Sequence, residues 1–323
     1  NFKVDETDHE IIKHQTSFIG YANTTSTGKV VDIIFKNQHV KQIDTTDEKF
    51  YVILDRTVFY PEGGGQISDT GSINNKNCQL NVTDVKKIQN TIVHFVQLKE
   101  GKLAVGDNVA LNIDETKRYK TAINHSATHL MHQSLRETLG NHVEQKGSLV
   151  TDDYLRFDFS HNKALSNQDI EHIEAQVISE ISKSIDTHSK NMSFKEAMKL
   201  GALAFFDEKY GDDVRVVYIG SSSIELCGGT HISNTRDIGL FKIISESGIS
   251  TGVRRIEAIT SQKANIFFND LHTQSKSLSQ QLNVKSEQIT DKITLMKKED
   301  SDNKKLISSL NKKIADLYYN SIE

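Results

Sequence analysis

Four side chains of the kinds that bind zinc occur in this sequence as two short pairs. His125 and His129 lie in NHSATHLMH, and Cys227 and His231 lie in ELCGGTHIS. Three residues separate the members of each pair, and about a hundred residues separate the pairs. Three imidazoles and one thiolate are a suitable ligand set for tetrahedral Zn²⁺, but neither pair can complete such a site alone. The sequence therefore predicts a zinc site if the fold brings the two pairs together.

The residues around each pair narrow the possible metal chemistry. Two histidines one helical turn apart are a weak indication by themselves, and a metalloprotease would have a Glu after the first His, where Ser126 stands here. The glycines of CGGTH let the chain turn so that the thiolate and the imidazole can face one centre. The nearest substitute ligands are His132 and His142, and His132 is one position off the face of His129. The sequence leaves open whether the site is closed and structural or open to water and substrate.

Length and charge set limits on the architecture and the partners. At 323 residues the chain is long enough for two or three domains. Its net charge of -4 argues against a general nucleic-acid coat, although a local basic cluster can still contact phosphate. The candidate clusters are Lys117, Arg118 and Lys120, and then Arg254 and Arg255. Charge alone favours a solvated surface for each of them.

Several features indicate an intracellular protein. No segment approaches the roughly 18 apolar residues that a membrane-spanning helix needs. The first residues, NFKVDETDHE, lack the basic and apolar segments of a secretory signal. Cys78 and Cys227 are predicted to be reduced thiols rather than a disulfide. We therefore expect a cytoplasmic protein without membrane contact, and we expect this chain to be part of a longer one because it begins without Met in a polar segment.

The first third of the chain has the pattern of a small β-structure. From about residue 16 to residue 118, short runs of Val, Ile, Phe and Thr alternate with Gly, Asn and Asp, which predicts a small barrel or sandwich. Within it lies FYPEGGGQISDTG, residues 59–71, with three consecutive glycines. A backbone without Cβ atoms can approach a ligand closely, but the same segment is also compatible with an ordinary hairpin loop.

The remainder mixes helices and strands and then becomes helical. A helix is predicted from Arg118 to Leu139, which puts His125 and His129 one turn apart on the same face. Strands follow around LRFDF and over 214–219, with a helix over 167–185 between them. After about residue 262, apolar residues with three-four spacing predict two helices, either folded back on each other or continuous as a coiled coil.

Five segments together resemble the editing region of bacterial alanyl-tRNA synthetase. They are FYPEGGGQISDTG, INHSATHLMHQSLRETLGNHVEQKGSLV, LRFDFSH, ELCGGTHISNTRDIGLFKIISESG and STGVRRIEAIT. The resemblance covers residues 16–262, and the helical tail resembles the spacer that follows in that family. It implies an α+β fold with a β-barrel and its Gly-rich loop over 1–118, a zinc-containing editing domain over 119–262 and a coiled-coil-like spacer over 263–323. The family's aminoacylation domain would precede residue 1.

The resemblance implies hydrolytic proofreading. An alanine pocket cannot exclude glycine by size and rejects a small hydroxyl weakly, so a second site is needed to remove wrong products. The implied substrates are Ser-tRNA(Ala) and Gly-tRNA(Ala), and the implied partner is the acceptor end of tRNA(Ala) carrying Ser or Gly. The helical tail is a candidate for homo-oligomer formation.

The resemblance also assigns roles to individual residues. The family's zinc ligands fall on the four residues of the two pairs. Gln145 matches a glutamine that lines the editing pocket, and Gln66 and Ser68 belong to the matching Gly-rich motif. Arg254 matches a position associated with the substrate or the tRNA end. No Asp or Glu is expected beside the histidines, which favours zinc and substrate groups over a carboxylate base.

Three other interpretations remain. A free-standing trans-editing protein of the AlaX type has the same fold and reaction. The editing domain of threonyl-tRNA synthetase also has a His pair and a Cys-x-x-x-His segment, but it lacks a preceding barrel with GGGQ. A zinc-stabilised tRNA-binding module without catalysis is the third interpretation, and removal of the metal distinguishes it from an enzyme.

Overall fold

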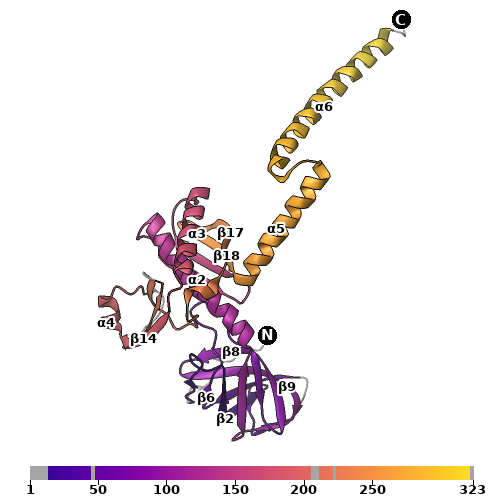
Figure 1. Ribbon diagram of the computed structural model, residues 1–323. Helices are drawn as coiled ribbons and strands as arrows, with labels where there is room; N and C mark the ends of the chain where they lie inside the picture. Colours follow the sequence, from indigo (N-terminus) through magenta and orange to yellow (C-terminus); the bar gives the residue numbers. More distant parts are fainter. Residues whose placement is uncertain (1–13, 45–47, 205–210, 221–222, 321–323) are drawn as a thin grey trace. The chain divides into compact units, whose positions relative to one another are not determined.

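The computed structural model describes residues 14–44, 48–204, 211–220 and 223–320. The chain divides into two compact units, of which the larger ends at Ala264 and the smaller begins at Asn265 (Figure 1). The segment NFKVDETDHE lies outside the described residues. Among the residues that are described, no helix is both long and apolar enough to cross a bilayer.

The larger unit begins with a closed six-stranded antiparallel barrel. Its strands follow the order β11-β7-β8-β9-β5-β2, and pairing of β11 with β2 closes the barrel. Alternation explains how it closes around a core: Cys78, Leu80 and Val82 of one strand are buried, whereas Gln79 between them is exposed. The strands are β2 (Thr25–Phe35), β5 (Lys49–Leu54), β7 (Gly71–Asn74), β8 (Cys78–Ile88), β9 (Thr91–Gly101) and β11 (Asn108–Ile113).

Short strands complete this part of the larger unit. β3 (Gln38–His39) pairs with β2, β1 (Ser17–Phe18) pairs with β6 (Arg56–Thr57), and β4 (Gln42–Ile43) pairs with β10 (Leu103–Ala104). The sequence predicted either a barrel or a sandwich here, and the structure is a barrel.

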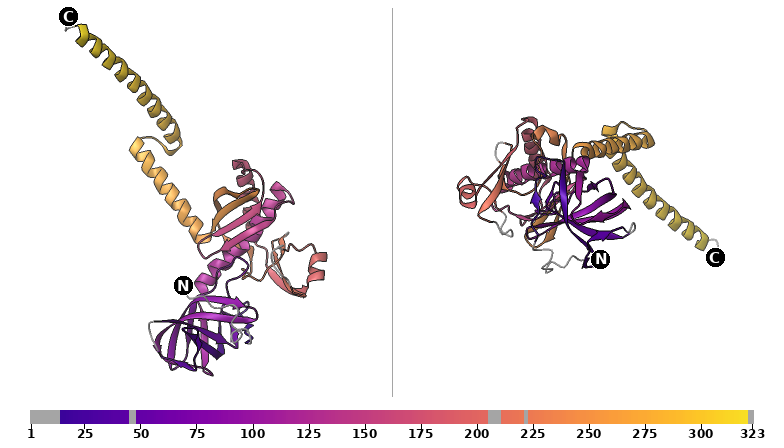
Figure 2. Two further views of the ribbon diagram at one scale, coloured as in Figure 1. Left: turned by 180° about the vertical axis from the view of Figure 1, so that it is seen from behind. Right: turned by 90° about the horizontal axis from the view of Figure 1, so that it is seen from below.

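The rest of the larger unit is a helix pair on an antiparallel sheet, with a smaller sheet beside it (Figure 2). The four-stranded sheet has the order β12-β13-β18-β17, and Phe157 and Phe159 from its second strand are fully buried in the core shared with the helices. The α+β class is confirmed. The elements are α2 (Glu115–Leu139), β12 (Gln145–Val150), β13 (Leu155–Ser160), α3 (Asn167–Ser182), β14 (His188–Ser193), α4 (Phe194–Lys199), β15 (Asp213–Ile219), β16 (Ser223–Leu226), the 3₁₀ turn η1 (Thr235–Ile238), β17 (Phe241–Ser250) and β18 (Val253–Thr260).

Capping residues set the helix ends. Helix α2 begins three residues before the predicted start because the Asp114 carboxylate accepts a hydrogen bond from the Lys117 N–H, and it ends before Gly140 as predicted. Helix α3 ends three residues before the predicted end, since Ser184 has a φ of 53° and the N–H of Ile185 donates to Thr235 instead. Because α2 runs across residues 118 and 119, the barrel and the helix-and-sheet part that follows it share one continuous helix, and a boundary there stays a prediction.

The smaller unit is helical. Helix α5 (Ser261–Leu282) starts in the larger unit, and η2 (Ser286–Gln288) and α6 (Ile289–Asn320) follow. The helical conformation is interrupted at Asn283, whose φ is 52°, so the tail is two helices rather than one continuous helix. Over their described residues, α6 does not run back along α5 (Figures 1 and 2). Large apolar side chains on α6 remain exposed, among them Leu306, Leu310 and Ile314.

A buried histidine lies in the barrel wall. His94 on β9 is fully buried, with its Nδ1 3.0 Å from the carbonyl oxygen of Val52 and its Nε2 2.8 Å from the hydroxyl of Thr57. The carbonyl can only accept, so Nδ1 carries the proton and Nε2 accepts from the hydroxyl. Burial lowers the pKa of His94 from 6.5 to about 4, and its hydrogen bond to Val52 offsets this only in part.

We expect His94 to make the barrel sensitive to acid. The unfolded chain takes up this proton below about pH 6.5, whereas the folded chain resists it down to about pH 4, so stability falls as the pH is lowered through that window. At pH 4.5 the loss is about 2 to 3 kcal/mol relative to pH 7. Urea unfolding of the wild type and of His94→Asn at both pH values measures it, because the Asn side chain can still donate to Val52 but does not titrate. Equal pH dependence in the two proteins would show that His94 is not responsible.

Candidate metal centre

The four predicted ligands converge in the larger unit. His125 and His129 project from the middle of α2, and Cys227 and His231 lie in the loop that leaves β16. One ligand atom from each of the four lies within 4.8 Å of the others. The Cys227 Sγ is 3.4 Å from His125 Nε2 and 3.3 Å from His231 Nε2. The fold thus joins two pairs that the sequence places about a hundred residues apart.

The ring orientation of two histidines leaves Nε2 facing the cluster. The Nδ1 of His125 is 2.7 Å from Gln66 Oε1, and the Nδ1 of His231 is 3.1 Å from Ser126 Oγ. The amide oxygen can only accept, so Nδ1 of His125 carries the proton and its Nε2 has a free lone pair. A partner on the outer ring nitrogen is the usual arrangement for a metal-binding histidine, because it fixes both the tautomer and the ring plane.

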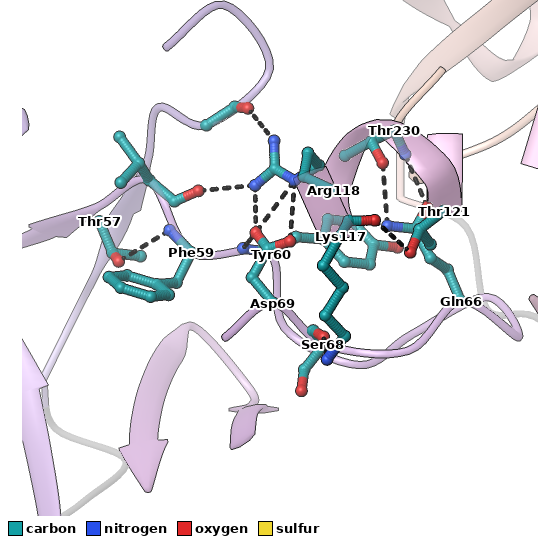
Figure 3. A network of polar contacts seen from close by, with 12 residues as sticks. Thr57, Phe59, Tyr60, Gln66, Ser68, Asp69, Lys117, Arg118, Thr121 and Thr230 are labelled. Carbon is teal, nitrogen blue, oxygen red and sulfur yellow. Dashed lines mark hydrogen bonds and ion pairs between the residues drawn. The ribbon is translucent and has the colours of Figure 1, made fainter. Parts of the chain in front are cut away.

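Gln66 connects three segments through one amide group. Its Oε1 accepts a hydrogen bond from His125. The same oxygen accepts from the Thr230 N–H at 2.8 Å, and the Gln66 Nε2 donates to Thr230 Oγ1 at 2.9 Å (Figure 3). The side chain is 1% exposed. The Gly-rich loop that precedes it pairs with β12, where Val150 N–H donates to the carbonyl of Gly65 at 2.7 Å. The structure therefore places Gln66 behind the cluster, where it positions His125.

The protonation states of the clustered histidines suit a bound metal cation. Burial, followed by the neighbouring His129 and Arg215, holds the pKa of His125 well below 6.5. Burial and the two other histidines of the cluster do the same for His231. Burial also lowers the pKa of His129, and the nearby Glu225 offsets this only in part. All three rings are therefore neutral at physiological pH and have lone pairs to share. Three neutral imidazoles and one cysteine are a donor set that fits Zn²⁺.

A buried carboxylate lies beside the cluster, which corrects the expectation that none would. Glu225 is 2% exposed, and its Oε2 is 3.4 Å from the Nδ1 of His129 while its Oε1 is 3.1 Å from the Nδ1 of His132. Burial alone would raise the pKa of Glu225. The nearby His129 and His132 and hydrogen bonds from His132 and Ser223 lower the pKa by more than burial raises it, so the group is an anion. Because residues two apart on an extended segment share a face, the sequence E-L-C, in which Cys227 directly follows β16, contained a signal for this placement.

A small cavity adjoins the ligands. It has a volume of about 30 Å³, enough for roughly two water molecules. Gly64 of the Gly-rich loop and Gln145 of β12 line it together with His125, His129, Cys227 and Glu225. The predicted pocket glutamine and the predicted loop therefore meet at the metal centre, although they are some eighty residues apart in the sequence.

The remaining predicted residues lie farther away. Both carboxylate oxygens of Glu246 accept hydrogen bonds from Arg254, which does not line the cavity. The strand register puts Gln145 opposite Phe159 and Phe159 opposite Arg254, which separates Gln145 and Arg254 by two strand spacings, about 10 Å. Ser68 donates to a carboxylate oxygen of Asp84 at 2.6 Å. Neither Arg254 nor Ser68 contacts the cluster among the described interactions.

One member of the predicted basic clusters is not a surface residue. Arg118 is 8% exposed and forms an ion pair with Asp69 (Figure 3). Its remaining N–H groups donate to the carbonyl oxygens of Gly20 at 2.6 Å and Val58 at 2.8 Å. Arg118 is therefore unavailable to phosphate, and it joins the first turn of the histidine helix to the barrel.

Comparison with known proteins gives two family matches and a set of close relatives. Residues 1–117 match class II (A) tRNA synthetases, and residues 214–257 match the second additional domain of threonyl and alanyl tRNA synthetases. The chain is 43% identical over 302 residues to the alanine–tRNA ligase of Alkaliphilus metalliredigens, covering 93% of the chain and 34% of that relative. It is 41% identical over 319 residues to the alanine–tRNA ligase of Staphylococcus aureus strain MSSA476, covering 97% and 36% respectively.

Over 93–97% of its length the chain is therefore similar to alanine–tRNA ligases. It spans about a third of the length of the curated relatives it matches. The second additional domain matched in threonyl and alanyl tRNA synthetases contains Cys227 and His231, and Gln66 lies in the segment matched to class II synthetases. The His/Cys cluster is therefore built from both matched segments and from α2 between them.

Replacing Arg118 tests the join between helix and barrel. We expect Arg118→Met to lower the free energy of unfolding by about 3 to 5 kcal/mol, because it leaves the Asp69 carboxylate buried without its partner. Arg56→Met is the matched control, since Arg56 is on the barrel surface with a side chain 57% exposed and should cost less than about 1 kcal/mol. Urea denaturation measures both. Similar losses in the two variants would contradict the assigned role of Arg118.

The two glycines of the Cys loop provide a matched pair for the metal centre. A Cβ on Gly229 would lie 2.0 Å from His125 Cε1, whereas a Cβ on Gly228 would meet no atom within 4 Å. We expect Gly229→Ala to weaken zinc binding by at least about 100-fold and Gly228→Ala to leave it within about threefold. Titration against a chromogenic chelator gives both affinities. Equal affinities would show that close approach of this loop to His125 is not required.

Proposed function

We propose that this chain hydrolyses the ester bond of Ser-tRNA(Ala) and Gly-tRNA(Ala), as the proofreading region of an alanyl-tRNA synthetase. The observation that carries the proposal is the cavity in which Gln145 and Gly64 adjoin His125, His129 and Cys227. Similarity to alanine–tRNA ligases suggests the substrate class. The two matched synthetase segments both contribute side chains to this one site.

Four residues would hold the metal. His125, His129, Cys227 and His231 are the proposed zinc ligands, and Gln66, Ser126 and Glu225 orient the three rings from outside. Bound zinc would supply Lewis acidity toward a water molecule or toward the amine or hydroxyl of the amino acid.

The cavity selects by polarity as well as by size. A volume of about 30 Å³ admits only a small side chain, but the methyl group of alanine fits as easily as the hydroxymethyl group of serine. Discrimination therefore needs a polar partner, and the Gln145 amide can donate a hydrogen bond to a hydroxyl, amine or ester oxygen. We propose Gln145 as the residue that contacts the substrate, whereas Gln66 acts through His125. Arg254 is proposed as a contact for the tRNA end outside the cavity.

Two further proposals concern partners and location. The partner is the aminoacylated acceptor end of tRNA(Ala), in the cytoplasm. The exposed apolar residues of α6 support a second partner, another copy of this chain paired along the tail, because their three-four spacing is that of a coiled-coil seam.

Deacylation of purified Ser-tRNA(Ala) tests the proposed activity. We expect Gln145→Ala to lower kcat/KM by about 100-fold, as the loss of one donor at a reacting centre usually does. Cys227→Ala should abolish activity together with zinc binding. Gln79→Ala, on the exposed face of β8, is the control and should match the wild type. Undiminished rates in both the Gln145 and Cys227 variants would refute the assignment.

A zinc-stabilised tRNA-binding module is the second candidate. The observation in its favour is that four side chains of ligand type converge, the number that fills the shell of a structural zinc site. Removal of zinc by a chelator separates the two candidates. An enzyme loses turnover while its circular dichroism spectrum is retained, whereas a structural site loses its fold.

A further inference from the structure

Three consecutive carbonyl groups of the Cys loop are held from one side. Arg215 donates from Nη1 to the carbonyl oxygen of Cys227 at 2.9 Å and to that of Gly229 at 2.8 Å. The hydroxyl of Tyr21 donates to the carbonyl oxygen of Gly228 between them, at 2.7 Å. The Arg215 guanidinium also lies 4.1 Å from the centre of the Tyr21 ring, so the two donors support each other.

The opposite side of the same peptides faces the cluster. The Gly229 N–H donates to Cys227 Sγ at 3.3 Å, and the Thr230 N–H donates to Gln66 Oε1 at 2.8 Å. A peptide group whose carbonyl is fixed has its N–H fixed in the opposite direction, because the peptide unit is planar. The orientation of the carbonyl groups therefore sets the hydrogen bond to the thiol and the hydrogen bond to Gln66.

We propose that Tyr21 and Arg215 form a clamp that positions Cys227 for the metal and maintains the N–H···S hydrogen bond to its sulfur. Both are positioning residues, since they hold the backbone of the loop and touch no reacting atom. The inference rests on the metal centre of the proposed function, and it assigns the barrel a second contribution to that centre besides Gln66.

The position of the clamp in the fold supports this role. Arg215 is on β15, and its own carbonyl oxygen accepts from the Cys227 N–H at 3.0 Å, so the residue holds both ends of the Cys227 backbone. Tyr21 comes from the first turn of the barrel, 207 residues from Gly228 along the chain. Together with His231 the two side chains line a cavity of about 460 Å³, which is separate from the one that Gln145 lines. A loop with two glycines has little stiffness of its own, so it needs such external contacts to keep one conformation.

The test measures metal binding rather than turnover. Tyr21→Phe removes only the hydroxyl, and Arg215→Lys keeps the charge but replaces the rigid planar guanidinium that lies over the Tyr21 ring with a compact ammonium on a flexible stem. We expect zinc affinity, from competition with a chelator, to fall about 10-fold in Tyr21→Phe and up to about 100-fold in Arg215→Lys. In the cobalt-substituted proteins, the near-ultraviolet thiolate-to-metal band should shift in both variants, because the hydrogen bond to sulfur changes. Tyr119→Phe, on an exposed tyrosine that lines the same cavity, should change neither.

The outcomes separate the clamp from the proposed function. Wild-type affinity and an unshifted cobalt band in Tyr21→Phe and Arg215→Lys, in a wild type that deacylates Ser-tRNA(Ala), would overturn the clamp alone. A wild type that binds zinc but does not deacylate would overturn the proposed activity and leave the clamp standing. A wild type that takes up no zinc would overturn both. Thermal unfolding of the metal-free variants identifies any affinity loss that comes from a general loss of fold.

Discussion

The structure depends on one buried amide. Gln66 is at the end of a barrel loop, yet its oxygen accepts hydrogen bonds from a helix side chain and from the backbone of the Cys loop. Two donors on one oxygen, and a third bond from the amide nitrogen, leave the side chain no freedom and fix which nitrogen of His125 faces the cluster. The Cys227–His231 pair and the His125–His129 pair can share one centre because this amide is hydrogen-bonded to both segments. Every other feature of the site is arranged around that join.

Buried charge has a comparable role on either side of the centre. Arg118 and Asp69 link the first turn of α2 to the barrel, and Glu225 lies against His129 and His132 behind the ligands. Removing such groups from water is costly, so each persists because several hydrogen bonds meet it. Arg118 also binds two carbonyl oxygens of the barrel. The result is a helix whose position relative to the barrel is fixed by directional contacts, which a zinc site with four ligands requires.

The sequence predicted what neighbours along the chain determine. Periodicity gave α2 and the shared face of His125 and His129, and runs of Val, Ile, Phe and Thr between turn residues gave the barrel strands. It did not predict the burial of Arg118, the approach of Glu225 to His129 or the contact of Tyr21 with the Cys loop, because these pairs meet across elements far apart in the sequence. Spacing does not encode such contacts. For the tail, apolar spacing predicted helices correctly but contains no information about what covers them.

The four-ligand centre is the claim on which the proposed activity and the clamp both rest. X-ray absorption at the zinc edge of the zinc-loaded protein tests it most directly. The account predicts one sulfur ligand at about 2.3 Å and three nitrogen ligands at about 2.0 to 2.1 Å. A shell of nitrogen and oxygen without sulfur, or one with fewer than three imidazoles, would contradict it.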